Sequence, residues 1–191
     1  LYGYDIDIDL REPGPEEKMP VVHELYDGQK FDLGGGRVIT AYDCPGHSLG
    51  EMVFLDEQTR TLFAGDALNY NLGIGTVPVE TTLRYLKRIR DMGDKYDGIW
   101  NGHHDFRAVG VPLDEDCLPT VIEMCEDILK GNYSPVQIPS FWGQDMPLGR
   151  RSKTVEAPSM VDGKPAEVRK RITIRKGRNF LGFNPDLIYE E

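Results

Sequence analysis

The amino-acid sequence predicts an α/β fold, in which helices cover a layered core of strands. Two observations support this prediction. In the first third of the 191-residue chain, short apolar runs alternate with turn residues, as they do in strands joined by hairpins. From Thr76 onward the apolar residues are spaced three or four apart, which is typical of helices with one buried face. Strands followed by helices in this order favour an α/β core.

The expected strands begin with the first residues. Residues 1–10 (LYGYDIDIDL) alternate apolar residues with glycine or aspartate, which predicts a strand with one face in water. Residues 30–33 (KFDL) and 37–43 (RVITAYD) surround three glycines and predict a hairpin. Residues 52–55 (MVFL) and 61–66 (TLFAGD) predict a second hairpin, with a polar turn between them.

Two helices are expected after these hairpins. The first begins near Pro78, which suits a first helical turn, and ends near Gly93. The second begins with Asp114 as its N-cap and is closed by Gly131. A short apolar strand at 98–102 (GIWNG) separates the two helices. The buried face of the first helix would carry Val79, Leu83, Leu86 and Ile89.

This regular patterning is lost after Asn132. Residues 154–175 suggest two strands joined at Asp162-Gly163, a dipeptide that is favoured in hairpin turns. We therefore divide the sequence into a domain at 1–131 and a C-terminal extension at 132–191 that carries a basic β-hairpin.

The formal net charge is −10, but the charge is unevenly distributed. Between residues 150 and 178, ten basic residues stand against three acidic ones, a local balance of +7 that leaves −17 on the rest. An acidic body is repelled by nucleic acids and anionic membranes, so we expect neither as a partner. The basic segment would instead dock on its own protein, on a second subunit or on an anionic group of a substrate. A solvated strand face with alternating charge is the simpler alternative.

The cysteines and the start of the sequence bear on the cellular compartment of the protein and on the completeness of the chain. Cys44, Cys117 and Cys125 form no CxxC pair and are odd in number, so we expect reduced thiols and a cytoplasmic protein. No apolar run reaches the roughly 18–20 residues of a membrane-spanning helix. The sequence begins without Met and without a secretory signal, which we interpret as the start of an incomplete chain.

Three short motifs place a glycine directly before a histidine or an aspartate: PGHS at 45–48, FAGD at 63–66 and NGHH at 101–104. Each motif lies at the start or the end of an expected strand, where a rigid sheet can hold polar side chains in a cleft. Imidazole nitrogens and carboxylate oxygens are ligands that zinc and similar divalent metals prefer. Each motif is weak by itself, but their order and context together indicate a metal site.

The segment from Lys30 to about Gly131 resembles the C-terminal half of the metallo-β-lactamase fold superfamily. The resemblance is carried by FDLGGGRVITAYDCPGHSLGEMVFLDEQTRTLFAGDAL and by IWNGHHDF. It implies a four-layer αβ/βα sandwich, represented in this sequence by its C-terminal half plus the C-terminal β-hairpin.

The resemblance also implies a role for each motif. His47 would be a ligand of a first metal ion, Asp66 would bridge two metal ions, and His103 would be a ligand of the second. His104 is the alternative to His103; otherwise it would hydrogen-bond substrate or lie on the surface. The cofactor would be two divalent ions, zinc in the first place, with iron or manganese as alternatives.

The stretch ALNYNLGIGTVP, directly after Asp66, is expected to line the cleft, with Tyr70 and Asn71 as candidate substrate contacts. An ordinary connection between a strand and a helix is an equally good interpretation of this stretch.

One part of the family pattern is absent from the sequence. The HxHxDH motif, which supplies the remaining ligands, cannot be formed from its four histidines, His23, His47, His103 and His104. Each metal would keep one imidazole and a shared carboxylate, a half-site that holds metal weakly or not at all. We favour the interpretation that the chain is a fragment of a longer enzyme, over the alternative that it is a natural non-catalytic relative.

The implied reaction is hydrolysis of an ester, thioester, lactone, lactam or phosphoester of a small-molecule substrate by a metal-bound hydroxide. We expect the chain alone to be inactive, because its site is incomplete. The alternatives are a non-catalytic binding or assembly module of the same fold and an iron-dependent oxidoreductase relative. The missing N-terminal half, or a second subunit, would cover an exposed sheet face, so we also expect self-association into a homo-oligomer.

Overall fold

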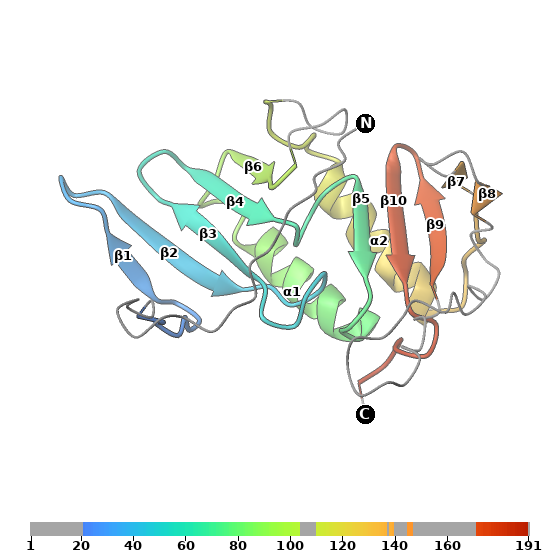
Figure 1. Cartoon of the computed structure of the whole chain (residues 1–191). Coiled ribbons are helices and arrows are strands. Elements are labelled where there is room, and N and C mark those ends of the chain that lie inside the picture. The colour runs from blue at the N-terminus through green and yellow to red at the C-terminus, as the bar shows by residue number, and fades with distance from the viewer. Residues whose placement is uncertain (1–20, 104–109, 137, 140–144, 147–170, 191) are drawn as a thin grey trace, which may run out of the picture.

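Two main β-sheets stand side by side in the protein, and two helices lie behind them (Figure 1). The computed structural model describes residues 21–103, 110–136, 138–139, 145–146 and 171–190. The strand expected at 1–10 lies outside these residues. The mixed α/β architecture predicted from the sequence is confirmed.

The first sheet is built from the two hairpins that the sequence predicts. Its strands are β1 (Lys30–Asp32), β2 (Val38–Asp43), β3 (Met52–Asp56), β4 (Thr61–Gly65) and β6 (Gly98–Asn101), in the order β1-β2-β3-β4-β6. The first four are antiparallel to their neighbours, and β6 runs parallel to β4. Three successive glycines, residues 34–36, make the first turn, with φ of 82°, 63° and 83°, a region that other residues rarely adopt.

The two helices lie behind the sheets and pack on each other (Figure 1). Helix α1 (Val79–Asp91) begins directly after Pro78, as predicted, and buries the four expected apolar residues against the sheet. Helix α2 (Cys117–Leu129) packs along α1 and also contacts β9 and β10. The residue after its C-cap, Gly131, has a φ of 68°, so its predicted role in closing the helix is confirmed.

The predicted start of α2 was wrong by two residues, because its N-cap is Asp116 and not Asp114. Asp114 is engaged elsewhere. Its backbone N–H donates to the hydroxyl of Tyr70 at 2.7 Å, and its carboxylate pairs with Arg178.

The second sheet was not expected from the sequence. It consists of β5 (Asn71–Ile74), β9 (Ile172–Lys176) and β10 (Asn179–Phe183), in the order β5-β10-β9. Strand β10 runs parallel to β5 and antiparallel to β9. The β9–β10 hairpin turns at 177–178, whereas the turn predicted at Asp162-Gly163 lies outside the described residues. A further short pair consists of β7 (Ile138–Pro139) and β8 (Asp145–Met146).

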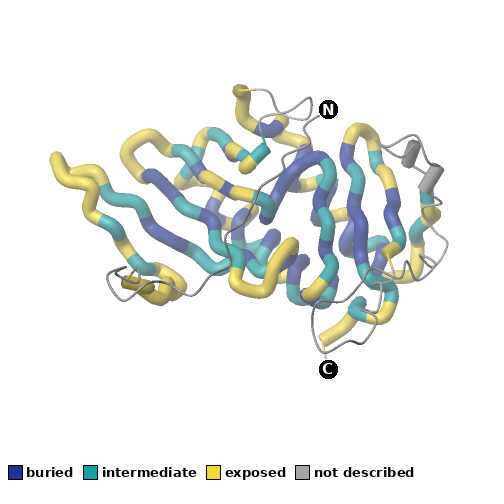
Figure 2. Tube along the Cα trace, viewed as in Figure 1, coloured by how far each residue is buried: buried dark blue, intermediate teal, exposed yellow. Residues whose placement is uncertain are grey.

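Strand β10 belongs to the same hydrophobic core as the first sheet. Leu181 and Phe183 are fully buried and join one cluster with Leu72 of β5 and the apolar faces of both helices. Figure 2 shows the buried stretches of these strands in dark blue. The division of the chain at residue 131 stays a prediction, but β10, which lies beyond it, is a central strand and not a peripheral addition.

Two further observations bear on the expected reduced thiols and on membrane-spanning helices. Cys44, Cys117 and Cys125 are all buried and free, and burial raises the pKa of each thiol to about 12. Among the described helices, none is both long and apolar enough to span a bilayer.

Candidate functional site

Asp66 and His103 meet at one edge of the first sheet. Because β4 and β6 are parallel, their carboxyl ends lie side by side, and each of these residues follows shortly after one of those ends. Nε2 of His103 lies 2.8 Å from Oδ1 of Asp66. Two of the three ligands that the family resemblance implies are therefore neighbours in the structure.

The glycines that precede these residues allow this approach. The N–H of Gly102 donates to the carbonyl of Gly65 at 2.7 Å, so the two loops are joined by their backbones. A Cβ at Gly102 would lie only 3.3 Å from the carbonyl carbon of Gly65, and Gly65 has a φ of 52°. The Gly-Asp and Gly-His steps thus have a structural reason, which is the close contact of two strand ends.

Oδ1 of Asp66 is buried without a hydrogen bond, despite the short distance to His103. Nδ2 of Asn101 and Oδ1 of Asn71 are likewise buried without a hydrogen bond. Buried polar atoms in native proteins nearly always have a partner, because leaving one unsatisfied costs about 1–3 kcal/mol. An unsatisfied carboxylate oxygen next to an imidazole nitrogen fits a pair of donors for a divalent cation.

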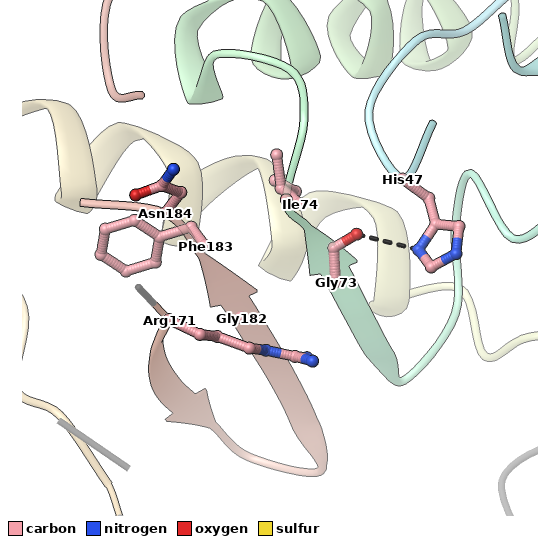
Figure 3. Close-up of a pocket in the computed structure, with 8 residues that line it drawn as sticks. His47, Gly73, Ile74, Arg171, Gly182, Phe183 and Asn184 are labelled. Atoms are coloured by element: carbon pink, nitrogen blue, oxygen red, sulfur yellow. Dashed lines mark hydrogen bonds between the residues drawn. The ribbon is translucent and has the colours of Figure 1, made fainter. Parts of the chain in front are cut away.

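His47 is held in a defined tautomer. Its Nδ1 lies 2.9 Å from the carbonyl oxygen of Gly73 on β5, as Figure 3 shows. A carbonyl oxygen only accepts hydrogen bonds, so Nδ1 carries the proton and Nε2 keeps a lone pair in the neutral ring. This is how metal-binding histidines are commonly oriented. The turn that carries His47 packs on α1, where a Cβ at Gly46 would lie 2.9 Å from Cγ2 of Thr82.

Glu51 is a residue of this region that the sequence reasoning missed. Its carboxylate accepts a hydrogen bond from the N–H of Ser48 at 3.2 Å. Burial raises the pKa of Glu51; the backbone N–H groups of Ser48 and Asp66 and the ring of His47 oppose this effect, while the Asp66 carboxylate adds to it. Glu51 therefore interacts with both the His47 turn and the end of β4. No spacing in the sequence indicated this, because the contact depends on how β3 and β4 pair.

The described residues supply only part of a metal site. Asp66 and His103 are adjacent, and Nε2 of His47 keeps a lone pair. Among the described residues, however, no three His, Cys, Asp or Glu side chains are grouped so that they could hold a metal ion. His104 lies outside the described residues. The donor types fit a divalent metal, but the described part of the chain does not complete its coordination.

The two candidate substrate contacts have different surroundings. Tyr70 is only 4% exposed, its hydroxyl accepts the Asp114 N–H, and the Arg178 guanidinium lies 3.8 Å from its ring centre. These contacts hold the ring and the hydroxyl of Tyr70 in place, and its contact with substrate stays a prediction. Asn71 begins β5 and is half-buried, and the loop that was expected to line a cleft contains this strand.

A pocket of about 340 Å³ opens beside His47, on one face of the paired strands β5 and β10 (Figure 3). Gly73, Gly182 and Phe183 form part of its wall, and the side chain of Arg171 runs across it. Volumes of this size are typical of sites for small molecules. Arg171 comes from the basic segment, whose role the sequence left open between three alternatives.

The family of the chain follows from a comparison with known proteins. Residues 2–108 match the family model of the metallo-beta-lactamase superfamily, which is more than half of the chain. The chain therefore belongs to the metallo-β-lactamase superfamily, and the resemblance noted from its motifs is confirmed.

Curated relatives match over part of their length. An atrochrysone carboxyl ACP thioesterase of Aspergillus fumigatus is 35% identical over 71 residues, which is 37% of this chain and 21% of the relative. A lactamase-like protein, adaB, of Aspergillus niger is 34% identical over 88 residues, 46% of this chain and 26% of the relative. The matching part thus spans about a quarter of the length of these relatives.

Among solved structures, a metallo-beta-lactamase family protein from Thermus thermophilus is similar. It has a TM-score of 0.45 and 22% sequence identity, and the match covers 56% of this chain and 36% of that one.

Proposed function

We propose that this chain is the C-terminal, ligand-bearing part of a metal-dependent hydrolase. Asp66, His103 and His47 would hold divalent ions, zinc in the first place, together with further ligands from polypeptide outside this sequence. The observation that carries this proposal is the buried, unsatisfied Oδ1 of Asp66, 2.8 Å from Nε2 of His103. A carboxylate oxygen without a hydrogen bond is costly in the metal-free chain and becomes favourable once a cation binds it.

Bound divalent ions would supply an activated water at neutral pH and polarise the bond under attack. The chain's own residues would hold those ions in place. The carbonyl of Gly73 fixes the ring of His47, and the contact between Gly65 and Gly102 sets the separation of Asp66 and His103. The need for further ligands agrees with the quarter of the relatives' length that the match spans.

Acyl thioesters are the substrates to test first. A thioesterase name is carried by several of the curated relatives, at 33–36% identity. Hydrolysis adds water across the acyl carbon–sulfur bond, so the acyl group leaves as a carboxylic acid and the sulfur as a thiol. Released thiol can be followed with a chromogenic disulfide, because Cys44, Cys117 and Cys125 are buried and react slowly.

The metal site is tested by zinc titration of the metal-free chain in competition with a chromophoric chelator. We expect weak binding, because the described residues hold only part of a coordination sphere, and a loss of at least about tenfold in affinity in Asp66→Asn. Asp91→Asn, an exposed carboxylate at the end of α1, is the matched control and should leave the affinity unchanged.

The melting temperature of Asp66→Asn shows whether Asp66 is a metal ligand or a residue that stabilises the fold. Oδ1 of Asp66 makes no hydrogen bond but lies 2.8 Å from Nε2 of His103, so Asp66→Asn should change the melting temperature of the metal-free chain by no more than the loss of a half-exposed ion pair does. Equal zinc affinity in Asp66→Asn and the wild type would refute the proposed site. Tight binding of iron with oxygen consumption would instead favour the oxidoreductase alternative. Because the chain alone is expected to be inactive, thioester hydrolysis is measured in a longer polypeptide that supplies the remaining ligands, and activity that persists there in Asp66→Asn would exclude a role for this centre.

A further inference from the structure

The basic segment binds acids of its own chain in two places. Nζ of Lys176 lies 2.5 Å from Oε1 of Glu123 and 3.5 Å from Oδ2 of Asp127, both on α2. Arg178 pairs with Asp114. These described members of the segment thus follow the first of the three alternatives, docking on their own protein.

Arg171 differs from them. Within the described part of the chain, its guanidinium has no acidic partner and no hydrogen bond. The described residues that line the surrounding pocket include no Asp or Glu. Burial lowers the pKa of Arg171, because the group is partly removed from water, yet an arginine stays charged at neutral pH. A positive charge that is partly desolvated and uncompensated favours an anion from outside the chain.

Two glycines make room for this side chain. Gly73 of β5 and Gly182 of β10 are partners in the parallel register, so two adjacent strands lack a side chain at the same level. A Cβ at Gly182 would overlap the guanidinium, and one at Gly73 would lie 3.2 Å from Nη2. The arginine therefore lies flat across the sheet, with its charged end turned toward the part of the pocket where His47 lies (Figure 3).

We propose that Arg171 and the pocket on the face of the paired strands β5 and β10 form a subsite for an oxyanion, a carboxylate or a phosphate, of the substrate. A planar guanidinium matches either group with two parallel hydrogen bonds. His47 lines the same pocket, so an anion bound there lies beside a proposed metal ligand. That the anion belongs to a substrate rests on the proposed hydrolase function, whereas anion binding itself does not.

The test is a titration of the metal-free chain with inorganic phosphate and, separately, with acetate. It is run at pH 8, with chloride holding the ionic strength constant. The Cε1–H resonance of His47 is followed by NMR, which four histidines in the chain make simple to assign. We expect a saturable shift, and the anion that binds more tightly identifies the substrate group as phosphate-like or carboxylate-like.

Arg171→Gln should weaken this binding about ten- to a hundredfold, as loss of a charge-assisted pair of hydrogen bonds does. Arg175→Gln is the matched control, because Arg175 lies on the adjoining strand β9 but stacks on Phe180 outside the pocket. Gly182→Ala tests the same idea without removing the charge, since the added methyl group displaces the guanidinium. A net charge of −10 makes unspecific attraction of anions a poor explanation for any saturable binding.

The proposal would be overturned if neither anion gave a saturable shift up to about 50 mM, a concentration far above the dissociation constants of ordinary weak complexes. It would also be overturned if Arg171→Gln bound the anion as tightly as the wild type, or if Arg175→Gln lost as much affinity as Arg171→Gln. The absence of metal keeps this test separate from the hydrolase proposal. A chain that binds no zinc but binds phosphate through Arg171 would refute the hydrolase and leave the anion subsite intact.

Discussion

Two carboxylates at opposite ends of β3 show how strongly surroundings determine the behaviour of a single residue. Glu51 precedes the strand, and burial raises its pKa. Asp56 is the last residue of the strand and is fully buried. Burial alone would raise its pKa, but Arg37 and the N–H groups of Gln58 and Thr59 together hold the pKa below its usual value. The two residues should therefore respond to pH in opposite directions.

Glu51→Gln should raise the melting temperature at pH 7 by a few degrees. A carboxyl group whose pKa is raised by folding favours the folded state while it is protonated, and this contribution is lost as the pH rises through the folded pKa. The gain in the variant should therefore disappear below about pH 4, where the carboxyl group is protonated in both states. Thermal melts of the metal-free chain between pH 4 and pH 8 measure it.

For Asp56→Asn we expect a change in melting temperature of the opposite sign to that of Glu51→Gln. Because folding lowers the pKa of Asp56, its carboxylate stabilises the fold at pH values above the pKa that it has in the unfolded chain. This stabilisation is lost as the pH falls through the pKa of the folded state. The variant should melt several degrees lower at pH 7 and approach the wild type in acid. If the melting temperatures of the two variants, relative to the wild type, changed with pH in the same direction, the causes given for the pKa shifts of Glu51 and Asp56 would be wrong.

At the scale of elements, β10 holds the second sheet and the helices together. Leu181 is fully buried and is paired in register with Leu72 of β5 and Ile174 of β9. Leu181→Ala should lower the free energy of unfolding by about 2–5 kcal/mol, because it leaves a cavity in a shared core. Urea denaturation measures this, with Lys176→Met on the exposed side of β9 as a control that changes the midpoint little.

One cooperative transition, followed by fluorescence and by circular dichroism, should report this loss. If Leu181→Ala destabilised only a separate, early transition, the C-terminal strands would be an independent unit, as a division at residue 131 expects.

Local signals in the sequence were sufficient to predict the strands of the first sheet and the presence of both helices. Their hairpins and helical faces depend on neighbouring residues, such as the glycines at 34–36 and the spacing from Val79 to Ile89. Strand β5 was missed because NLGI is four residues long, includes a glycine, and pairs with residues 180–183, far along the chain. Glu51 and Arg171 were missed for the same reason, since their surroundings come from strands that only the fold brings together.

At the scale of the molecule, the first sheet has one face that none of the described helices covers. Phe63 of β4 and Trp100 of β6 are register partners on this face and are 41% and 36% exposed. Paired exposed aromatic residues on a sheet favour association with another apolar surface. The expected self-association therefore remains a proposal, with this face as its site.

Trp100→Ser should reduce concentration-dependent association in sedimentation velocity, because it removes the larger part of the exposed aromatic pair. Leu33→Ser, a 56% exposed residue in the turn after β1, is the matched control and should leave association unchanged. A wild-type chain that stays monomeric at about 100 μM, well above micromolar affinities, would contradict this prediction.

The parallel pairing of β5 with β10 also has a consequence for synthesis on the ribosome. More than a hundred residues separate the two strands, so at roughly 5–20 residues per second β5 waits about 5–20 s for its neighbour to be made. During that time the Gly73 carbonyl, which orients His47, belongs to an unpaired edge. The nascent chain should therefore need protection by chaperones at this edge, and the histidine should acquire its fixed orientation only in the last stage of folding.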